Sequence, residues 1–234
     1  MNLQEVMAEL EALGSERTKK QYISRGAKEP LFGVATGAMK PMFKKIKFNQ
    51  PLAEELYATG NYDAMYFAGM IADPMAMTEA DFDRWMQSAY FFMLSDYVVA
   101  VTLSESDVAT SVANRWIKSG EELYVSAGYA CYQWLLGWRP DSYFEPDKIA
   151  VILDEAVASI ESQTGHVRKV ISDFIAAMGV SYMPLHGQAV AAAESLNKYQ
   201  TANAGTCAPF SASLVIQKAK DQGRLGFKRR AVRC

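Results

Sequence analysis

The chain has 234 residues, of which 50% are hydrophobic and 21% charged, and its formal net charge is −2. This composition excludes a disordered protein and is typical of a globular chain that can bury a large core. The first residues lack the basic and apolar segments of a signal peptide, and no apolar run is long enough to span a bilayer. We therefore expect a protein with no membrane partner.

The cysteines and histidines are few and scattered. Cys131, Cys207 and Cys234 are odd in number and far apart, and His166 and His186 are the two histidines. Without an export signal, this pattern indicates reduced thiols and a cytoplasmic location. Because no cluster has the spacing of metal ligands, we expect no metal site and no cofactor.

Charge is distributed unevenly along the chain. Residues 1–47 hold nine Lys or Arg and five Asp or Glu, whereas residues 48–107 hold one basic and ten acidic residues. Residues 108–217 hold seven basic and ten acidic residues, and residues 218–234 hold seven basic and one acidic. The two basic ends predict an anion-binding face if the fold brings them to one side; the alternative is two solvated ends.

Helical periodicity runs through the whole chain. Apolar residues recur at helical spacing from Leu3 to Leu13 and stop at Gly14. Later helices are bounded by Gly, Pro or capping residues such as Asn61 and Thr78. In chain order they cover residues 17–25, a basic stretch within 32–47 that follows residues 32–34, then 51–60, 62–72, 78–85, a short stretch within 85–104, 107–116, 121–138, 146–160, 165–179, 185–196 and 211–220.

The pattern predicts an all-α fold of about eleven to thirteen helices, because no stretch alternates apolar and polar residues long enough to form a strand. Residues 61–85 and 121–160 share the order helix, break, acidic cap, helix. Such a repeat favours an α-solenoid of antiparallel helix pairs with a concave face, although a helical bundle would give a similar pattern. We expect a helical repeat domain over residues 1–222 and a basic tail over residues 223–234.

One carboxylate interrupts the most apolar stretch of the chain. Residues 85–104 are apolar and aromatic almost throughout, and Asp96 lies in their middle with Phe92 one helical turn earlier. An acid in such surroundings is paired, hydrated in a cleft, or neutral. The sequence leaves two interpretations open, a helix cap bonded to backbone or a cleft carboxylate beside an aromatic wall.

Two basic segments and one aromatic stripe also have two possible interpretations each. Lysines at 40, 44, 45 and 47 form either a solvated face or a phosphate-contacting one. The tail either contacts phosphates or packs back on the last helix with Phe227 as its anchor. The aromatic residues form either core or a stacking platform for bases. The residues concerned are Lys40, Lys44, Lys45, Lys47, Lys228, Arg229, Arg230, Tyr124, Tyr129, Tyr132, Trp134 and Trp138.

The order of several loose motifs resembles a known family, the AlkD-type DNA alkylation repair proteins, which are built from HEAT-like helical repeats. The resemblance covers roughly residues 5–234. The motifs that carry it are residues 32–34 before a basic helix, Leu56–Asp63, Ala68–Pro74, Phe92–Asp96, Cys207–Pro209 and the tail Gly223–Cys234.

The resemblance implies a C-shaped solenoid that binds duplex or branched DNA on its concave face, acts as a monomer and needs no cofactor. Active members of the family are monofunctional glycosylases that release N3- or N7-alkylated purines, with one carboxylate stabilising an oxocarbenium-like sugar. By this resemblance Asp96 is the catalytic residue, at the concave surface and partly exposed, and Phe92 replaces the tryptophan beside it. Arg168 and Lys169 match a basic pair that precedes a second tryptophan.

Besides Phe92, the chain departs from the family pattern at two more places. An acid, Asp173, stands where the second tryptophan is expected, and residues 123–128 contain no arginine where the family has one. An arginine there would hold a backbone phosphate or support the carboxylate. The sequence therefore predicts DNA binding with weak or no base excision; the alternatives are an active glycosylase and a helical-repeat scaffold that binds protein.

Overall fold

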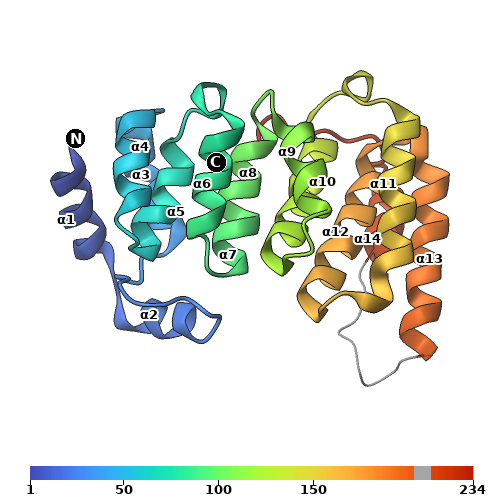
Figure 1. Cartoon of the computed structure of the whole chain (residues 1–234), viewed down its shortest axis with the longest axis horizontal. Coiled ribbons are helices and arrows are strands. Elements are labelled where there is room, and N and C mark those ends of the chain that lie inside the picture. The colour runs from blue at the N-terminus through green and yellow to red at the C-terminus, as the bar shows by residue number, and fades with distance from the viewer. Residues whose placement is uncertain (203–211, 234) are drawn as a thin grey trace. The chain divides into compact units, whose positions relative to one another are not determined.

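The computed structural model describes residues 1–202 and 212–233, and these residues form two compact units. The first unit comprises Met1–Val112 together with Arg233, and the second comprises Ala113–Val232. Within the described residues every regular element is helical, which confirms the predicted all-α class (Figure 1). Cys207–Pro209 and Cys234 lie outside the described residues.

The first unit holds the helices up to the start of α9. Its main neighbours are α4 with α5, α3 with α5, and α5 with the segment that follows α6. The helices are α1 (Leu3–Leu13), α2 (Glu16–Ile23), α3 (Thr36–Ile46), α4 (Gln50–Ala58), α5 (Tyr62–Ile71), α6 (Glu79–Ser88), α7 (Phe92–Leu94), α8 (Ala100–Ser104) and α9 (Ala109–Ile117).

The second unit is built from two rows of helices. Helix α12 packs against α10 and α14, which form one row with it, and also against α11 and α13, which form the other (Figure 1). Successive helices from α11 to α14 contact one another, as the repeat in the sequence predicts. These helices are α10 (Glu122–Trp138), α11 (Pro146–Ser159), α12 (Gly165–Ser181), α13 (His186–Ala202) and α14 (Ala212–Asp221).

Local signals in the sequence set most helix boundaries. The side chain of Asn61 accepts hydrogen bonds from two backbone N–H groups at the start of α5, and Thr78 and Asp81 form a capping box at the start of α6. Gly60 and Gly120 adopt positive φ angles of 68° and 78° where helices end. Such caps depend on neighbours in sequence, so they were predictable.

Helix α3 begins at Thr36, so residues 32–34 precede it, as expected. The backbone N–H groups of Phe32, Gly33 and Val34 donate to the carboxylate of Asp63, at N–O distances of 2.6 to 2.9 Å. Asp63 is fully buried. These N–H groups are thus taken by a side chain of α5, and the segment stays extended until Thr36.

The segment around Asp96 is not one regular helix. Residues Ser95–Val99 form a π-helical turn, η2, between α7 and α8. The π turn separates α7 from α8, where the sequence predicts one short helix. The described residues therefore contain fourteen α-helices. A π turn adds a residue to the helical register and commonly marks a functional or strained site.

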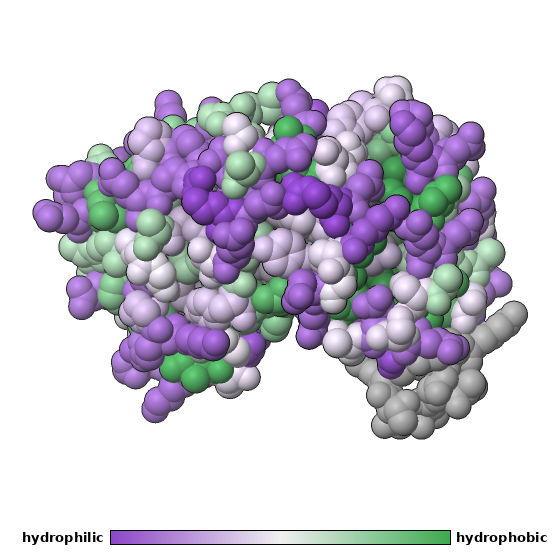
Figure 2. All heavy atoms as spheres, viewed as in Figure 1, coloured by the Kyte–Doolittle hydropathy of each residue, from purple (hydrophilic) through white to green (hydrophobic). Residues whose placement is uncertain are grey.

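Apolar side chains fill each unit, and the surface is mostly polar. In the first unit the rings of Tyr57 and Trp85 stack at 4.0 Å, and in the second Tyr129 and Tyr132 are buried against Phe174. Hydrophilic residues cover much of the face shown in Figure 2, with small hydrophobic patches between them. No helix of the described residues is long and apolar enough to cross a membrane.

Close packing of α9 on α10 makes Gly128 a sensitive position. A Cβ atom there would lie 2.9 Å from the carbonyl oxygen of Ala113 and 2.7 Å from Cγ1 of Ile117. We expect Gly128→Ala to lower the free energy of unfolding by about 1–2 kcal/mol, because the clash outweighs the better helix propensity of alanine.

Gly137, on the same helix, is the matched control. A Cβ atom there meets nothing within 4 Å, so Gly137→Ala should raise stability by about 0.5–1 kcal/mol. Denaturant unfolding monitored by circular dichroism measures both. Equal effects of the two substitutions would contradict the packing argument.

Candidate nucleic-acid interface

A pocket of about 600 Å³ opens in the second unit, between α10, α12, α14 and the C-terminal tail. Its walls come from helix faces with residues three or four apart, such as Gln133 and Gly137 on α10 and Asp173 and Ala177 on α12. Small residues on the same faces leave the space open. They are Gly137, Ala176, Ala177 and Ala219.

The pocket is lined by more positive than negative charge. Lys218, Arg224 and Arg229 line it together with one carboxylate, that of Asp173. Asp173 forms an ion pair with Lys169 at 2.5 Å, which offsets its charge within the site. The site therefore favours anions.

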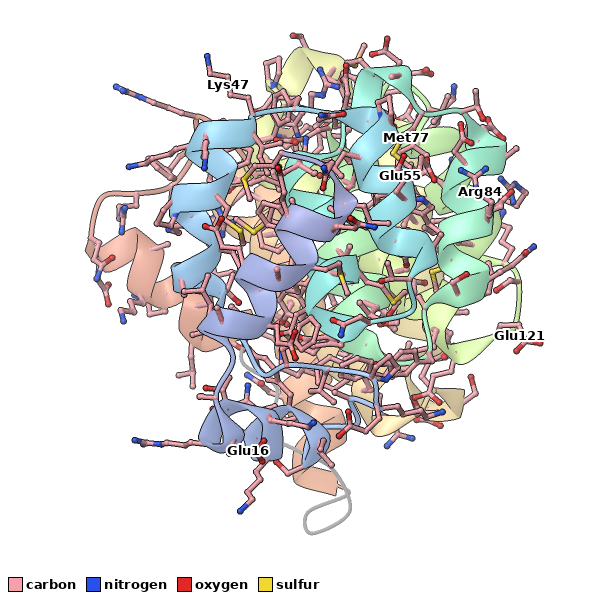
Figure 3. The ribbon with its side chains drawn as sticks, turned by 90° about the vertical axis from the view of Figure 1, so that its left-hand side faces the viewer. Glu16, Lys47, Glu55, Met77, Arg84 and Glu121 are labelled. Carbon is pink, nitrogen blue, oxygen red and sulfur yellow. The ribbon has the colours of Figure 1, made fainter. Side chains whose placement is uncertain are left out.

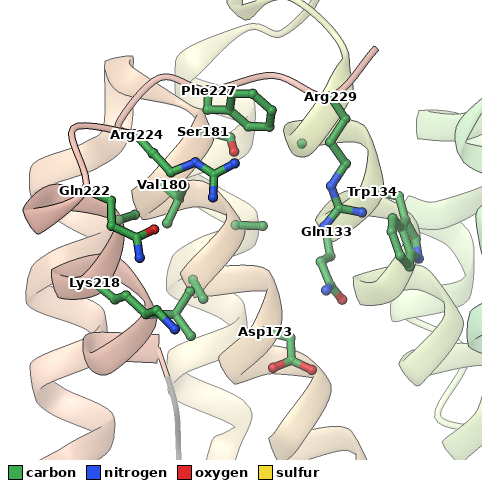
Figure 4. A pocket seen from close by; sticks show the side chains of 15 residues that line it. Gln133, Trp134, Asp173, Val180, Ser181, Lys218, Gln222, Arg224, Phe227 and Arg229 are labelled. Carbon is green, nitrogen blue, oxygen red and sulfur yellow. The ribbon is translucent and has the colours of Figure 1, made fainter. Parts of the chain in front are cut away.

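Polar and aromatic side chains face one another across this space. Figure 4 shows Lys218 and Arg224 on the side of α14 and the tail, with Trp134 and Arg229 on the opposite side. The guanidinium of Arg229 lies 4.9 Å from the centre of the half-buried Trp134 ring. An aromatic ring beside cations is able to stack a base while the cations bind phosphate.

The tail is held in place by main-chain hydrogen bonds to helix C-termini. The N–H of Gly226 donates to the Val180 oxygen at 2.7 Å, and the N–H of Arg229 donates to the Gly137 oxygen at 2.7 Å. These carbonyls belong to the last turns of α12 and α10, which have no partners within their own helices. These hydrogen bonds hold the backbone of the tail beside the pocket. The exposed arginine side chains of the tail are therefore attached to a fixed backbone.

Two tail cations serve structure directly. Lys228 donates to the Leu136 oxygen at 2.9 Å and pairs with Asp141 at 2.8 Å. In the first unit, Arg233 pairs with Glu105 at 2.5 Å and donates to the oxygens of Gly69 and Ala72. Burial lowers the pKa of the Arg233 guanidinium, and the Glu105 carboxylate opposes that shift.

The alternative expected for the tail, packing back on the last helix with Phe227 as its anchor, is wrong. The tail packs on α10 and α12 instead of on the last helix alone, and Phe227 is 49% exposed, so it is not a buried anchor. Of the predicted tail cations, Arg229 and Arg230 are exposed, and Lys228 is held by α10.

The two residues of the predicted basic pair, Arg168 and Lys169, make different contacts. Arg168 donates to the carbonyl oxygens of Ile160 and Glu161 and so caps the end of α11. Lys169 is exposed and pairs with Asp173 at the pocket wall. The structure thus brings Lys169, Asp173 and Arg229 to one site.

The other predicted site residues belong to the first unit. Lys40, Lys44, Lys45 and Lys47 are exposed along and just after α3, and Figure 3 shows Lys47 at the end of that helix, pointing outward. Asp96 is only 3% exposed, where we expected partial access, and it accepts a 2.8 Å hydrogen bond from the Ser95 hydroxyl. Phe92 is half-buried one turn earlier and packs edge-on against Phe91.

Sequence reasoning missed part of the pocket. Trp134 belongs to an aromatic stripe whose neighbours Tyr129 and Tyr132 are core residues, and periodicity alone does not separate the three. Gln133 and Gln222 carry no signal of function in a single sequence. Among the described residues, no group of three or more His, Cys, Asp and Glu side chains lies close enough to hold a metal ion.

Comparisons with known proteins agree on the family. The model of the DNA alkylation repair enzyme family matches residues 6–210. Uncharacterised proteins of Listeria innocua and Listeria monocytogenes are 26% and 25% identical over 221 and 220 residues, which is 92% of this chain and 95% of each relative.

A solved structure is 55% identical, with a TM-score of 0.91 and 100% coverage of both chains. That protein is described as one of a new family related to the HEAT-like repeat DNA glycosylases with affinity for branched DNA structures. The likeness confirms a HEAT-like repeat fold for this chain.

Proposed function

Because the chain belongs to the DNA alkylation repair enzyme family, we propose that it binds branched DNA and has weak or no base-excision activity. The observation that carries this proposal is the pocket between α10, α12 and α14, where Lys218, Arg224 and Arg229 gather beside Trp134. The full-length relative with affinity for branched DNA supports the choice of ligand. In this proposal, the row of α10, α12 and α14 is the second unit's part of the concave DNA-binding face that the family implies.

Phosphates supply most of the affinity in this proposal. Contacts from Lys and Arg to phosphate release counterions and make binding depend steeply on salt. They position DNA without reading its sequence. A branch point supplies phosphates from strands that diverge, so a concave cationic pocket contacts more of them than a straight duplex offers.

The lysines of α3 give the first unit a separate basic surface. Lys44 and Lys45 lie in the last turn of α3, where the helix dipole favours positive charge. We propose that they contact phosphates of a DNA arm. A protein-binding scaffold without a nucleic-acid role would show no salt-dependent affinity for DNA, which separates that alternative from this proposal.

Removing the three pocket cations is expected to flatten the salt dependence of DNA binding. The variant Lys218→Gln, Arg224→Gln, Arg229→Gln should reduce the slope of log K against log salt by up to about 2.7, since each neutralised phosphate contributes about 0.9. Fluorescence anisotropy of a labelled four-way junction at several salt concentrations measures the slope. Truncation after Gln222 is a poorer test, because it also removes the structural contacts of Lys228 and Arg233.

The matched control removes three cations that do not line the pocket. Lys118 and Lys148 pair with carboxylates elsewhere in the second unit, and Lys220 is exposed on α14. Replacing all three with glutamine should leave the slope nearly unchanged. The proposal fails if the wild-type protein does not prefer the junction over a linear duplex of the same sequence, or if the two triple variants behave alike.

A further inference from the structure

Resting on the proposed DNA binding, we infer that the pocket of the second unit takes one unpaired nucleotide of a branched DNA, with its base on Trp134 and its phosphate between Lys218 and Arg224. The size of the pocket, its aromatic side chain and the placement of its cations all fit an unpaired nucleotide.

The pocket has the dimensions of a small-ligand site. Its volume of about 600 Å³ lies within the range of about 300–1,000 Å³ typical of ligand pockets. A contact surface for the outside of a duplex needs no hollow of this volume, because the phosphates of a duplex lie on a convex ridge. Such a volume is required when a group leaves the helix and enters the protein.

The aromatic wall provides a place for a base. Trp134 is half-buried and lines the pocket beside Arg229. Paired bases are stacked inside a duplex and offer no free face to such a ring, whereas an unpaired base does. Arg229 lies against the same ring at 4.9 Å, so a guanidinium and a base are able to share the indole.

The cations stand across the pocket from the ring. Lys218 lies on α14 and Arg224 lies just after it, and Figure 4 shows both on the side opposite Trp134. Gly223, with φ of 62°, ends α14, and the N–H of Arg224 donates to the Ala219 oxygen. This hydrogen bond fixes the backbone position of Arg224. A nucleotide with its base on one wall thus has its phosphate near the other.

Polar groups on both sides of the pocket can bond the edge of a base (Figure 4). The amides of Gln133 and Gln222 each carry donors and an acceptor, and Asp173 supplies a carboxylate. Amides suit several base edges, so stacking and charge contribute more than base identity. The site is therefore expected to accept an unpaired nucleotide with little sequence preference.

The test compares two junctions that differ in one base. One three-way junction carries a single unpaired nucleotide at its branch point, and the other carries an abasic tetrahydrofuran residue at that position, which keeps the phosphate. The wild-type protein should bind the first at least tenfold more tightly. In Trp134→Ala and in the more conservative Trp134→Leu, that ratio should fall close to one, with thermal unfolding used to confirm that each variant is folded.

The outcomes separate this inference from the proposed function. Tight binding of both junctions with equal affinity by the wild-type protein would leave DNA binding intact and overturn the nucleotide site, leaving a phosphate site only. A tenfold ratio that persists in both Trp134 variants would place the unpaired base elsewhere and also overturn the inference. Failure to bind either junction would refute the proposed function itself.

Discussion

Replacing Asp63 with alanine is expected to lower the free energy of unfolding of the first unit by about 3–5 kcal/mol. The carboxylate is fully buried and accepts the N–H groups of Phe32, Gly33 and Val34. Removing it leaves three N–H groups without their acceptor in a buried place, and each such group costs about 1–3 kcal/mol when partners are lost. Partial rearrangement and entry of water bring the total below the sum.

The measurement is denaturant unfolding followed by circular dichroism, with Glu55→Ala as the matched control. Glu55 is an exposed acid on α4 in the same unit (Figure 3), so its loss should change stability by less than about 0.5 kcal/mol. Asp63→Asn should fall between the two, since an amide keeps one acceptor oxygen but adds a donor group. A loss below about 1 kcal/mol in Asp63→Ala would show that the extended segment does not depend on this carboxylate.

The role of Asp63 could not be predicted from the sequence. The caps at Asn61 and Thr78 and the glycine terminators use neighbours within four residues, so their roles could be predicted. The bonds of Asp63 reach back about thirty residues, and nothing in the local pattern distinguishes it from another first-turn acid. The contact that holds residues 32–34 extended before α3 could not be predicted for the same reason.

Cations that donate to helix ends were the least predictable residues. Arg168, Lys228 and Arg233 donate to carbonyl oxygens at the ends of helices, although in sequence they look like any solvated or phosphate-binding charge. A carbonyl without a partner within its helix needs a donor from elsewhere, and only the fold shows which cation supplies it. The order of the helices, by contrast, followed from periodicity, because apolar faces must be buried.

Incubation with DNA that contains N7-methylguanine is expected to release almost no free base. The family resemblance assigns catalysis to Asp96, whose side chain is 3% exposed and bonded to Ser95. Phe92 lacks the N–H of the indole that it replaces. Ser126 is fully buried in the segment where an arginine is expected, so this position presents no cation to a phosphate.

The size of the effect follows from the loss of transition-state contacts. Removing one preorganised electrostatic donor costs about 3 kcal/mol in the transition state, so two such losses cost about 6 kcal/mol. Since 1.36 kcal/mol corresponds to a factor of ten, excision should be about 10⁴-fold slower than in an active family member. Asp173, already paired with Lys169, adds no aromatic wall to offset this loss.

Chromatography of free methylated bases, sampled over hours with excess protein, checks the expectation, with Asp96→Asn as the control for any residual rate. A trace of release that is equal in both proteins would be spontaneous depurination, as the proposed lack of base excision predicts. Fast release that disappears in Asp96→Asn would mean that the π turn at Ser95–Val99 opens to expose the carboxylate when DNA binds. Because a buried carboxylate gains water contact only through such an opening, that result would also predict hydrogen exchange in residues 95–99 faster with DNA than without it.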